Sequence, residues 1–286
     1  MLIKSKLSAY ARLMRVDKPI GTYLVCWPML WALWIAGSGH PDGFIVFVFL
    51  LGAWVMRSAG CVINDYADRH LDARVQRTKN RPLATGEIRS IEALFLFFAL
   101  ISLALMLVLL LNPFTLQLAV AAVLLAAFYP FVKRWSHLPQ FVLGIAFAWS
   151  IPMAFAAVQN TVPYQAWVLF FATVLWVVVY DTMYAMVDRN DDCNIGVKST
   201  AILFGEHDKT IILALQVLMF SLLYCLGVDQ AWGVFYDLGL AIALGLAAYQ
   251  QYLIRNRERD ACFRAFLNNH YLGAAVFFGL FFDYAG

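Results

Sequence analysis

Charged residues are scarce in this 286-residue chain, and their scarcity excludes an ordinary soluble domain. Only 14% of the residues are charged, whereas 63% are hydrophobic; soluble domains carry about a quarter charged residues. The chain also lacks a Cys-x-x-Cys pair, and its five cysteines are scattered and odd in number. They therefore indicate neither a disulfide framework nor a zinc site. Long polar segments are missing too, so we expect a single membrane-embedded domain over residues 1–286.

The hydrophobic residues occur in continuous runs of about 17 to 24 residues, which is the length that crosses a bilayer as a helix. Because the runs are continuous and do not alternate, a membrane β-barrel is disfavoured. Turn-forming residues separate several of the runs, and Pro152, which lies inside one of them, is expected to kink it. The sequence thus predicts an all-α, polytopic membrane protein with nine transmembrane helices, at about 20–37, 44–63, 91–111, 114–132, 138–158, 164–187, 210–228, 234–253 and 268–284.

The positive charges are distributed asymmetrically across this topology. With the N-terminus placed inside, all 21 Lys and Arg residues fall in cytoplasmic segments, so the positive-inside rule predicts an N-inside, C-outside protein. Residues 1–18 are expected to form a cationic interfacial helix with Ile3, Leu7, Tyr10 and Met14 on its apolar stripe; a disordered basic leader is the alternative. The net charge of +3 is too small to indicate a nucleic-acid partner.

An acidic segment, Asn64–Asp72, follows the second apolar run. If the helix continues through it, Asn64, Asp68 and Asp72 lie four residues apart on one helical face. Three oxygen-bearing side chains in a line at the cytoplasmic end of a membrane helix favour a hard divalent cation. Asp65 lies off this face, so we expect it to support the ligands without binding metal.

A second acidic segment, Tyr180–Asp192, ends the sixth predicted helix in the same way. Asp181, Asp188 and Asp192 again share one helical face. Because the second and sixth helices are four apart, helices 1–4 and 5–8 suggest a pseudo-repeat, followed by helix 9.

Asp181 lies inside the apolar part of its helix, where a carboxylate is costly unless it is paired or faces a polar cavity. It is therefore predicted to be functional, with a salt bridge to Arg57 as the alternative.

Two facing rows of carboxylates predict a Mg²⁺ site for a phosphate ester, because Mg²⁺ binds a few carboxylates together with phosphate oxygens and water. The predicted metal ligands are Asn64, Asp68, Asp72, Asp188 and Asp192. Nearby basic residues can bind the remaining phosphate oxygens; they are Arg77, Lys79, Arg81, Arg134 and Lys198. Aromatic rings beside the site can stabilise a carbocation; the candidates are Trp27, Trp31, Trp34, Trp54, Phe128, Trp149, Trp176 and Tyr180.

Motifs along nearly the whole chain make it similar to the membrane-embedded aromatic prenyltransferases. Besides the two acidic segments, these motifs are Asp17-Lys-Pro-Ile-Gly21, Arg57, Thr78-Lys-Asn-Arg-Pro-Leu83, Tyr129-Pro-Phe-Val-Lys-Arg134, His137-Leu-Pro-Gln140, Gly144, Trp149-Ser-Ile-Pro-Met153 and Lys198-Ser-Thr200. The Asp-Lys-Pro, His-Leu-Pro-Gln and Trp-Ser-Ile-Pro-Met segments resemble the branch of the family that uses 4-hydroxybenzoate in bacterial ubiquinone synthesis.

The resemblance implies nine helices around a central cavity that opens laterally for a lipid tail, in the bacterial inner membrane, with the active site facing the cytoplasm. It implies Mg²⁺-dependent transfer of a polyprenyl group from a polyprenyl diphosphate to position 3 of 4-hydroxybenzoate, without an obligate protein partner. The implied diphosphate-binding residues are Arg77, Lys198 and Lys133 or Arg134. Arg57 or Arg134 pairs with the acceptor carboxylate, and Asp181 or the released diphosphate takes the ring proton.

Two alternatives stay open at this point. A related prenyltransferase with another aromatic acceptor, such as a naphthoate, homogentisate or haem, would carry the same acidic segments. A secondary transporter would use intramembrane acids for protons or cations, but those acids would lie near the middle of the bilayer in broken helices. In this chain nearly all the acids cluster at one face, which disfavours the transporter.

Overall fold

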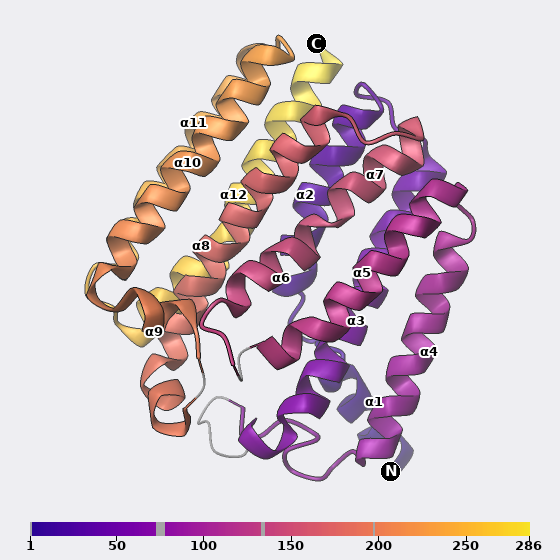
Figure 1. The fold of residues 1–286 in the computed structure, drawn as a ribbon, viewed down its shortest axis with the longest axis vertical. Coiled ribbons are helices and arrows are strands. Elements are labelled where there is room, and N and C mark those ends of the chain that lie inside the picture. Colours follow the sequence, from indigo (N-terminus) through magenta and orange to yellow (C-terminus); the bar gives the residue numbers. More distant parts are fainter. Residues whose placement is uncertain (1, 73–77, 133–134, 197) are drawn as a thin grey trace.

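The computed structural model describes residues 2–72, 78–132, 135–196 and 198–286, and the regular elements in those ranges are all helices (Figure 1). The all-α prediction is therefore confirmed. The elements are α1 (Leu2–Leu13), α2 (Ile20–Ala36), α3 (Gly43–Asp72), α4 (Ser90–Val108), α5 (Pro113–Val132), α6 (Pro139–Ala148), α7 (Ser150–Gln159), α8 (Tyr164–Ile195), α9 (Thr200–Phe204), the 3-10 turn η1 (Gly205–His207), α10 (Asp208–Asp229), α11 (Val234–Ile254) and α12 (Arg259–Ala285).

Six helical segments in the described ranges are long and apolar enough to cross a membrane: Gly43–Arg69, Ser90–Val108, Pro139–Gln159, Tyr164–Asn194, Thr200–Asp229 and Arg259–Ala285. Each predicted span has a helical counterpart, although α2 and the apolar part of α5 are shorter. The outer helices expose large hydrophobic side chains, such as Phe95, Leu124 and Val228 at 70%, 65% and 63%. Such a surface suits contact with lipid. The count of nine spans stays a prediction.

The fifth predicted span is broken into α6 and α7 at Trp149. Pro152 stands in the first turn of α7, where its ring nitrogen has no hydrogen to donate to the carbonyl one turn earlier. At the break, the Trp149 indole donates to the Leu118 carbonyl of α5 at 2.9 Å. The kink expected from Pro152 is therefore present, and it turns this segment between α5 and α8 (Figure 1).

The N-terminal helix differs from the prediction in length and in its buried face. α1 ends at Leu13, and the chain turns at Arg15 with φ 58°. Pro19 follows this turn and stands immediately before the first residue of α2. Ala9 and Leu13 are fully buried in a cluster with α3 and α4, whereas Leu7 is 62% exposed. The predicted helix is thus present but ends at Leu13 and not at residue 18, and it packs Ala9 and Leu13 on the bundle. Its place at the membrane surface stays a prediction.

The two helices that carry the acidic segments are the longest in the described ranges. α3 has 30 residues and α8 has 32, so each is about 45 to 48 Å long, well beyond the roughly 30 Å of hydrocarbon in a bilayer. Both acid-bearing ends lie at the lower end of Figure 1, where the N-terminus also lies, and the C-terminus lies at the opposite end. The expectation that both helices continue through their acidic segments is confirmed.

Two apolar clusters form the interior. The larger one surrounds α8, where the rings of Trp31 and Trp176 stack at 5.3 Å. The Trp31 indole donates to the Gly273 carbonyl at 3.0 Å, and the Trp176 indole donates to the Asn269 side-chain oxygen at 2.9 Å. The smaller cluster joins α1, α3 and α4. Both buried indole N–H groups thus have acceptors. These hydrogen bonds join α2 and α8 to α12, and the ring stacking joins α2 to α8.

Candidate active site

A cavity of about 1010 Å³ is lined by residues of both clusters, from helices α1 to α8 and α12 and from the loops beside them. Its polar lining includes Arg15, Arg57, Asn64, Asp65, Arg81, Asp181 and Asp188. The wall made by α4 and α5 is apolar. A cavity that joins a charged end to an apolar arm suits a ligand with a charged head and a hydrocarbon tail.

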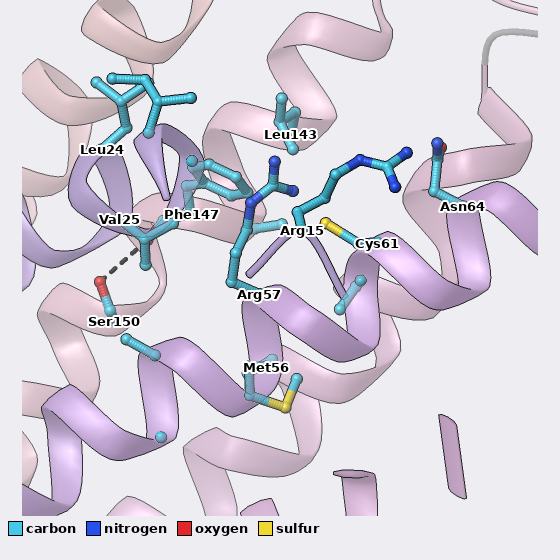
Figure 2. Close-up of a pocket in the computed structure, with 18 of the residues that line it drawn as sticks. Arg15, Leu24, Val25, Met56, Arg57, Cys61, Asn64, Leu143, Phe147 and Ser150 are labelled. Atoms are coloured by element: carbon cyan, nitrogen blue, oxygen red, sulfur yellow. Dashed lines mark hydrogen bonds between the residues drawn. The ribbon is translucent and has the colours of Figure 1, made fainter. Parts of the chain in front are cut away.

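Two arginines reach into this cavity from different segments. Figure 2 shows Arg57, on α3, directed toward Phe147, and Arg15, from the turn after α1, directed toward Asn64. The Arg57 guanidinium carbon lies 5.8 Å from the centre of the Phe147 ring. Arg57 was predicted as a functional residue; it lines the cavity, and its role stays a prediction. Arg15 was predicted only as part of a cationic surface helix.

The first acidic row is buried and tied to two arginines. Asp65 and Asp72 are 1% and 6% exposed. Arg81 contacts Asp65 at 2.8 Å and Asp72 at 2.9 Å, and Arg15 contacts the other oxygen of Asp65 at 2.8 Å. Asp65 therefore links the α1–α2 turn, α3 and the loop before α4. Sequence reasoning placed Asp65 off the ligand face, but it did not find these partners.

The carboxylates of this row are crowded, and the crowding favours a cation. Burial raises the pKa of the Asp72 carboxyl above its ordinary value; the Arg81 charge opposes this, and the charges of Asp65 and Asp68 add to it. A nearby divalent cation would offset that repulsion, and oxygen is the donor that Mg²⁺ prefers. The residues present thus fit a hard divalent cation.

The described residues do not form a closed metal cage. Among them, no three histidine, cysteine or carboxylate side chains converge to hold an ion. Asn64 and Asp188 line the cavity, while Asp68, Asp72 and Asp192 lie outside its lining. Because Mg²⁺ takes several ligands from phosphate and water, an open arrangement is compatible with metal held jointly by protein and substrate. The five-residue ligand set stays a prediction.

The second acidic segment contains acids that line the cavity and two, Asp191 and Asp192, that do not. Asp181, Tyr184 and Asp188 line the cavity, and Asp188 is 7% exposed. Asp191 instead accepts a bond of 2.6 Å from Arg259, which also donates to the Val187 carbonyl at 2.7 Å. Asp191 thus joins α8 to the start of α12.

A further ion-pair cluster holds the end of α8. Asp208 is fully buried, and both of its oxygens accept bonds of 2.7 to 3.1 Å from the guanidinium of Arg257. Arg189 on α8 lies 3.5 Å from Oδ2 of Asp208. Breaking a buried pair leaves an uncompensated charge, which costs about 3–5 kcal/mol. Because Arg257 remains one-third exposed, the cost in this case falls below that range.

We expect Asp208→Ala to destabilise the protein by about 2–3 kcal/mol, because two arginines lose their shared carboxylate. The measurement is thermal unfolding of the detergent-purified protein. Glu258→Ala is the matched control, since Glu258 is exposed and its side chain does not cap α12. Equal melting temperatures for the two variants would contradict the assignment.

The predicted basic and aromatic residues have mixed outcomes. Arg77, Lys133 and Arg134 lie outside the described residues. The Lys198 ammonium donates to the Trp135 carbonyl at 3.2 Å and lies outside the cavity lining. Of the eight aromatic candidates, Tyr180 lines the cavity; the rings that join it there are Phe49, Phe147, Tyr184, Phe263 and Phe266.

Comparison with known proteins identifies relatives over almost the full length. The chain is 58% identical to a curated 4-hydroxybenzoate octaprenyltransferase of Methylococcus capsulatus over 99% of this chain and 97% of the relative. It is also 58% identical to the enzyme of that name from Nitrosococcus oceani, over 99% of both chains.

Solved structures share the fold at lower identity. A UbiA homolog from Aeropyrum pernix superposes with a TM-score of 0.79 at 22% identity, over 89% of this chain and 96% of the other. A UbiA homolog from Archaeoglobus fulgidus bound to GPP and Mg²⁺ has a TM-score of 0.73 at 18% identity, over 94% and 99%. Residues 25–278 match the sequence profile of the UbiA prenyltransferase family. The chain therefore belongs to the UbiA prenyltransferase family.

Proposed function

We propose that this chain transfers a polyprenyl group from a polyprenyl diphosphate to position 3 of 4-hydroxybenzoate, a step of ubiquinone synthesis that depends on Mg²⁺. The observation that carries the proposal is the similarity, over nearly the full length, to curated enzymes named 4-hydroxybenzoate octaprenyltransferase. A cavity with a charged end and an apolar arm supports it, as does the related structure bound to GPP and Mg²⁺.

The charged end is the proposed place of the diphosphate. Bound Mg²⁺ would supply charge stabilisation for the leaving diphosphate. The proposed metal-binding residues are Asn64, Asp68, Asp72, Asp188 and Asp192. Arg77, Lys133 and Lys198 are proposed to bind further phosphate oxygens, which guanidinium and ammonium groups recognise through charge-assisted hydrogen bonds.

The part of the cavity beside Arg57 is proposed to hold the aromatic acceptor. Arg57 is a guanidinium within a largely apolar lining, which suits pairing with a benzoate carboxylate; Arg134 is the second candidate. The ring carbon beside the phenol then attacks the allylic carbon as its bond to diphosphate breaks, and the leaving diphosphate keeps the electron pair. Loss of the ring proton restores aromaticity. Asp181 lines the cavity and is proposed, with the diphosphate as the alternative, to accept that proton.

The apolar arm between α4 and α5 is proposed to hold the donor's hydrocarbon tail. Leu105, Val120 and Leu124 belong to the cavity lining, yet they are 50%, 59% and 65% exposed. The arm therefore opens at the lipid-facing surface. A prenyl tail gains about 0.8 kcal/mol per buried CH₂, so a tail that remains in lipid or in this arm avoids water throughout.

We expect Ala122→Phe to impair transfer from long donors by about tenfold and from geranyl diphosphate much less, because Ala122 lines the arm and a ring there fills space used by distal isoprene units. The measurement is kcat/KM for a series of prenyl diphosphates. Ala121→Phe is the matched control, since Ala121 is adjacent on α5 and outside the cavity lining. A uniform loss across all donor lengths would contradict this use of the arm.

The proposed topology has nine spans in the bacterial inner membrane, with helices 1–4 and 5–8 as a pseudo-repeat, a cytoplasmic N-terminus and active site, and an external C-terminus. The asymmetry of Lys and Arg supports it. The opposite positions of the two termini in Figure 1 fit an odd number of spans.

We expect an alkaline phosphatase fusion at Gly286 to be active and a green fluorescent protein fusion there to be dark, because the proposed C-terminus is external. The reverse result would reject the orientation.

One screen separates the proposed function from its rivals. The purified protein is incubated with Mg²⁺, several prenyl diphosphates and several aromatic acceptors, and products are analysed by mass spectrometry. We expect a 3-polyprenyl-4-hydroxybenzoate. Transfer to a naphthoate or homogentisate alone would favour a related prenyltransferase. Proton or cation uptake into liposomes without any transfer would favour the transporter.

A further inference from the structure

Gly21 lies directly against the guanidinium of Arg57. A methyl group added at Gly21 would overlap Nε and Nη2 of Arg57 and lie 2.7 Å from Cζ. These three atoms are its nearest neighbours, and all belong to one side chain. Gly21 stands at the second position of α2 and lines the same cavity as Arg57. The missing side chain thus leaves a notch on α2 that the guanidinium fills.

The backbone itself does not explain glycine at this position. Gly21 is helical, and it is absent from the glycines with positive φ, which are Gly39, Gly86, Gly196 and Gly205. Alanine forms helices more readily than glycine, so helix formation favours Ala at position 21. Close helix packing does not explain it either: at Gly239 an added methyl would meet backbone atoms of Ala275 and Gly279, whereas at Gly21 it meets a side-chain end.

The guanidinium is bounded on a second side by an aromatic ring. Its central carbon lies 5.8 Å from the centre of the Phe147 ring, and Figure 2 shows the Arg57 side chain directed toward that ring. A guanidinium is a planar fork whose pairing with a carboxylate depends on its orientation. Restricting its rotamers before the ligand arrives reduces the entropy lost on binding.

We propose that Gly21 is a positioning residue that determines specificity for carboxylated acceptors, because it lets the Arg57 guanidinium rest between α2 and Phe147. The inference rests on the proposed function, in which Arg57 pairs with the acceptor carboxylate. Gly21 acts through Arg57 and does not itself contact substrate. A larger residue at position 21 displaces the Arg57 guanidinium from the position in which it pairs with the acceptor carboxylate. Binding of the prenyl diphosphate is left unchanged.

The test compares Gly21→Ala with the parent enzyme in prenyl transfer to 4-hydroxybenzoate. Benzoate and benzamide serve as competitive inhibitors, because they share a shape and differ in charge. We expect the KM for 4-hydroxybenzoate and the Ki for benzoate to rise about tenfold, the loss expected when one charge-assisted hydrogen bond is misaligned. The Ki for benzamide and the KM for the prenyl diphosphate should stay within about twofold.

Folding is monitored by the melting temperature, with Gly245→Ala as the matched control. Gly245 lies within α11, outside the cavity lining, and a methyl there meets no described atom within 4 Å beyond its chain neighbours and its own helical backbone. A lower melting temperature for Gly21→Ala, an unchanged Ki for benzoate, or equal rises for benzoate and benzamide would each overturn the inference. Absence of transfer to 4-hydroxybenzoate by the parent enzyme would instead reject the proposed function.

Discussion

Replacing Asp72 with alanine is expected to reduce prenyl transfer by about a hundredfold or more while the protein stays folded. Asp72 ends α3 and is 6% exposed. As a proposed ligand it acts on the charge that develops on the leaving diphosphate, and removal of one such electrostatic contact costs about 10²- to 10³-fold in rate. The measurement is kcat with saturating donor, acceptor and Mg²⁺.

Retention of the fold in Asp72→Ala follows from the surroundings of that carboxyl. Its pKa is raised, first by burial and then by Asp65 and Asp68 against the opposing effect of Arg81, so its charge is poorly accommodated without a cation. Arg81 keeps its contact with Asp65 at 2.8 Å when Asp72 is removed. The melting temperature without Mg²⁺ should therefore change little.

Asp191→Ala is the control for the loss of an acid near the same site. Asp191 belongs to the second acidic segment but already pairs with Arg259 at 2.6 Å, and such partly exposed pairs contribute about 0–1 kcal/mol. We expect its activity to stay within about threefold of the parent. Substantial turnover by Asp72→Ala under excess Mg²⁺, or equal losses in both variants, would reject Asp72 as a ligand.

The sequence was sufficient to predict the features that depend on local patterns. Apolar runs determine where helices occur, because each run must satisfy its backbone hydrogen bonds within the membrane. The four-residue spacing of Asn64, Asp68 and Asp72 determines their common face once the helix continues. Pro152 marked the break between α6 and α7 because it lacks a backbone N–H. Each of these depends on residues close together in the chain.

Features that depend on contacts between distant segments could not be predicted from the sequence. Arg15 reaches Asp65 across 50 positions, and Arg259 reaches Asp191 across 68. Helical spacing carries no information about such pairs. The position of Arg15 just before the Asp17-Lys-Pro turn was the available signal, because the helix that ends at this turn packs against α3. Nor could spacing show that Gly21 adjoins Arg57.

The arginine contacts suggest how the two acidic rows are held in place before substrate binds. Arg15 and Arg81 fasten the end of α3, while Arg259 and the Asp208 cluster fasten the end of α8. Each contact joins an acid-bearing helix end to a neighbouring loop or helix. Preorganised charge of this kind costs no reorganisation during the reaction. Long helices alone would leave these ends to fray outside the bilayer.

Chelation of divalent cations is expected to abolish prenyl transfer, and added Mg²⁺ should restore it. The crowded carboxylates beside Asp72 repel one another, and a divalent cation would bind the folded protein in preference to the unfolded chain. A ligand at 100 times its dissociation constant stabilises a protein by about 2.7 kcal/mol. Mg²⁺ together with a prenyl diphosphate should therefore raise the melting temperature of the parent protein.

The same thermal measurement on Asp72→Ala connects the two expectations. If Asp72 binds the cation, its removal weakens the metal site, so the rise in melting temperature with Mg²⁺ and prenyl diphosphate should shrink or disappear. Asp191→Ala should keep the full rise, because Asp191 is already paired with Arg259. Activity that resists chelation would reject the metal dependence. A full rise in the melting temperature of Asp72→Ala would support a metal site but show that Asp72 is not one of its ligands. Binding and folding are thermodynamically linked, so a weaker affinity for the metal must appear as a smaller stabilisation.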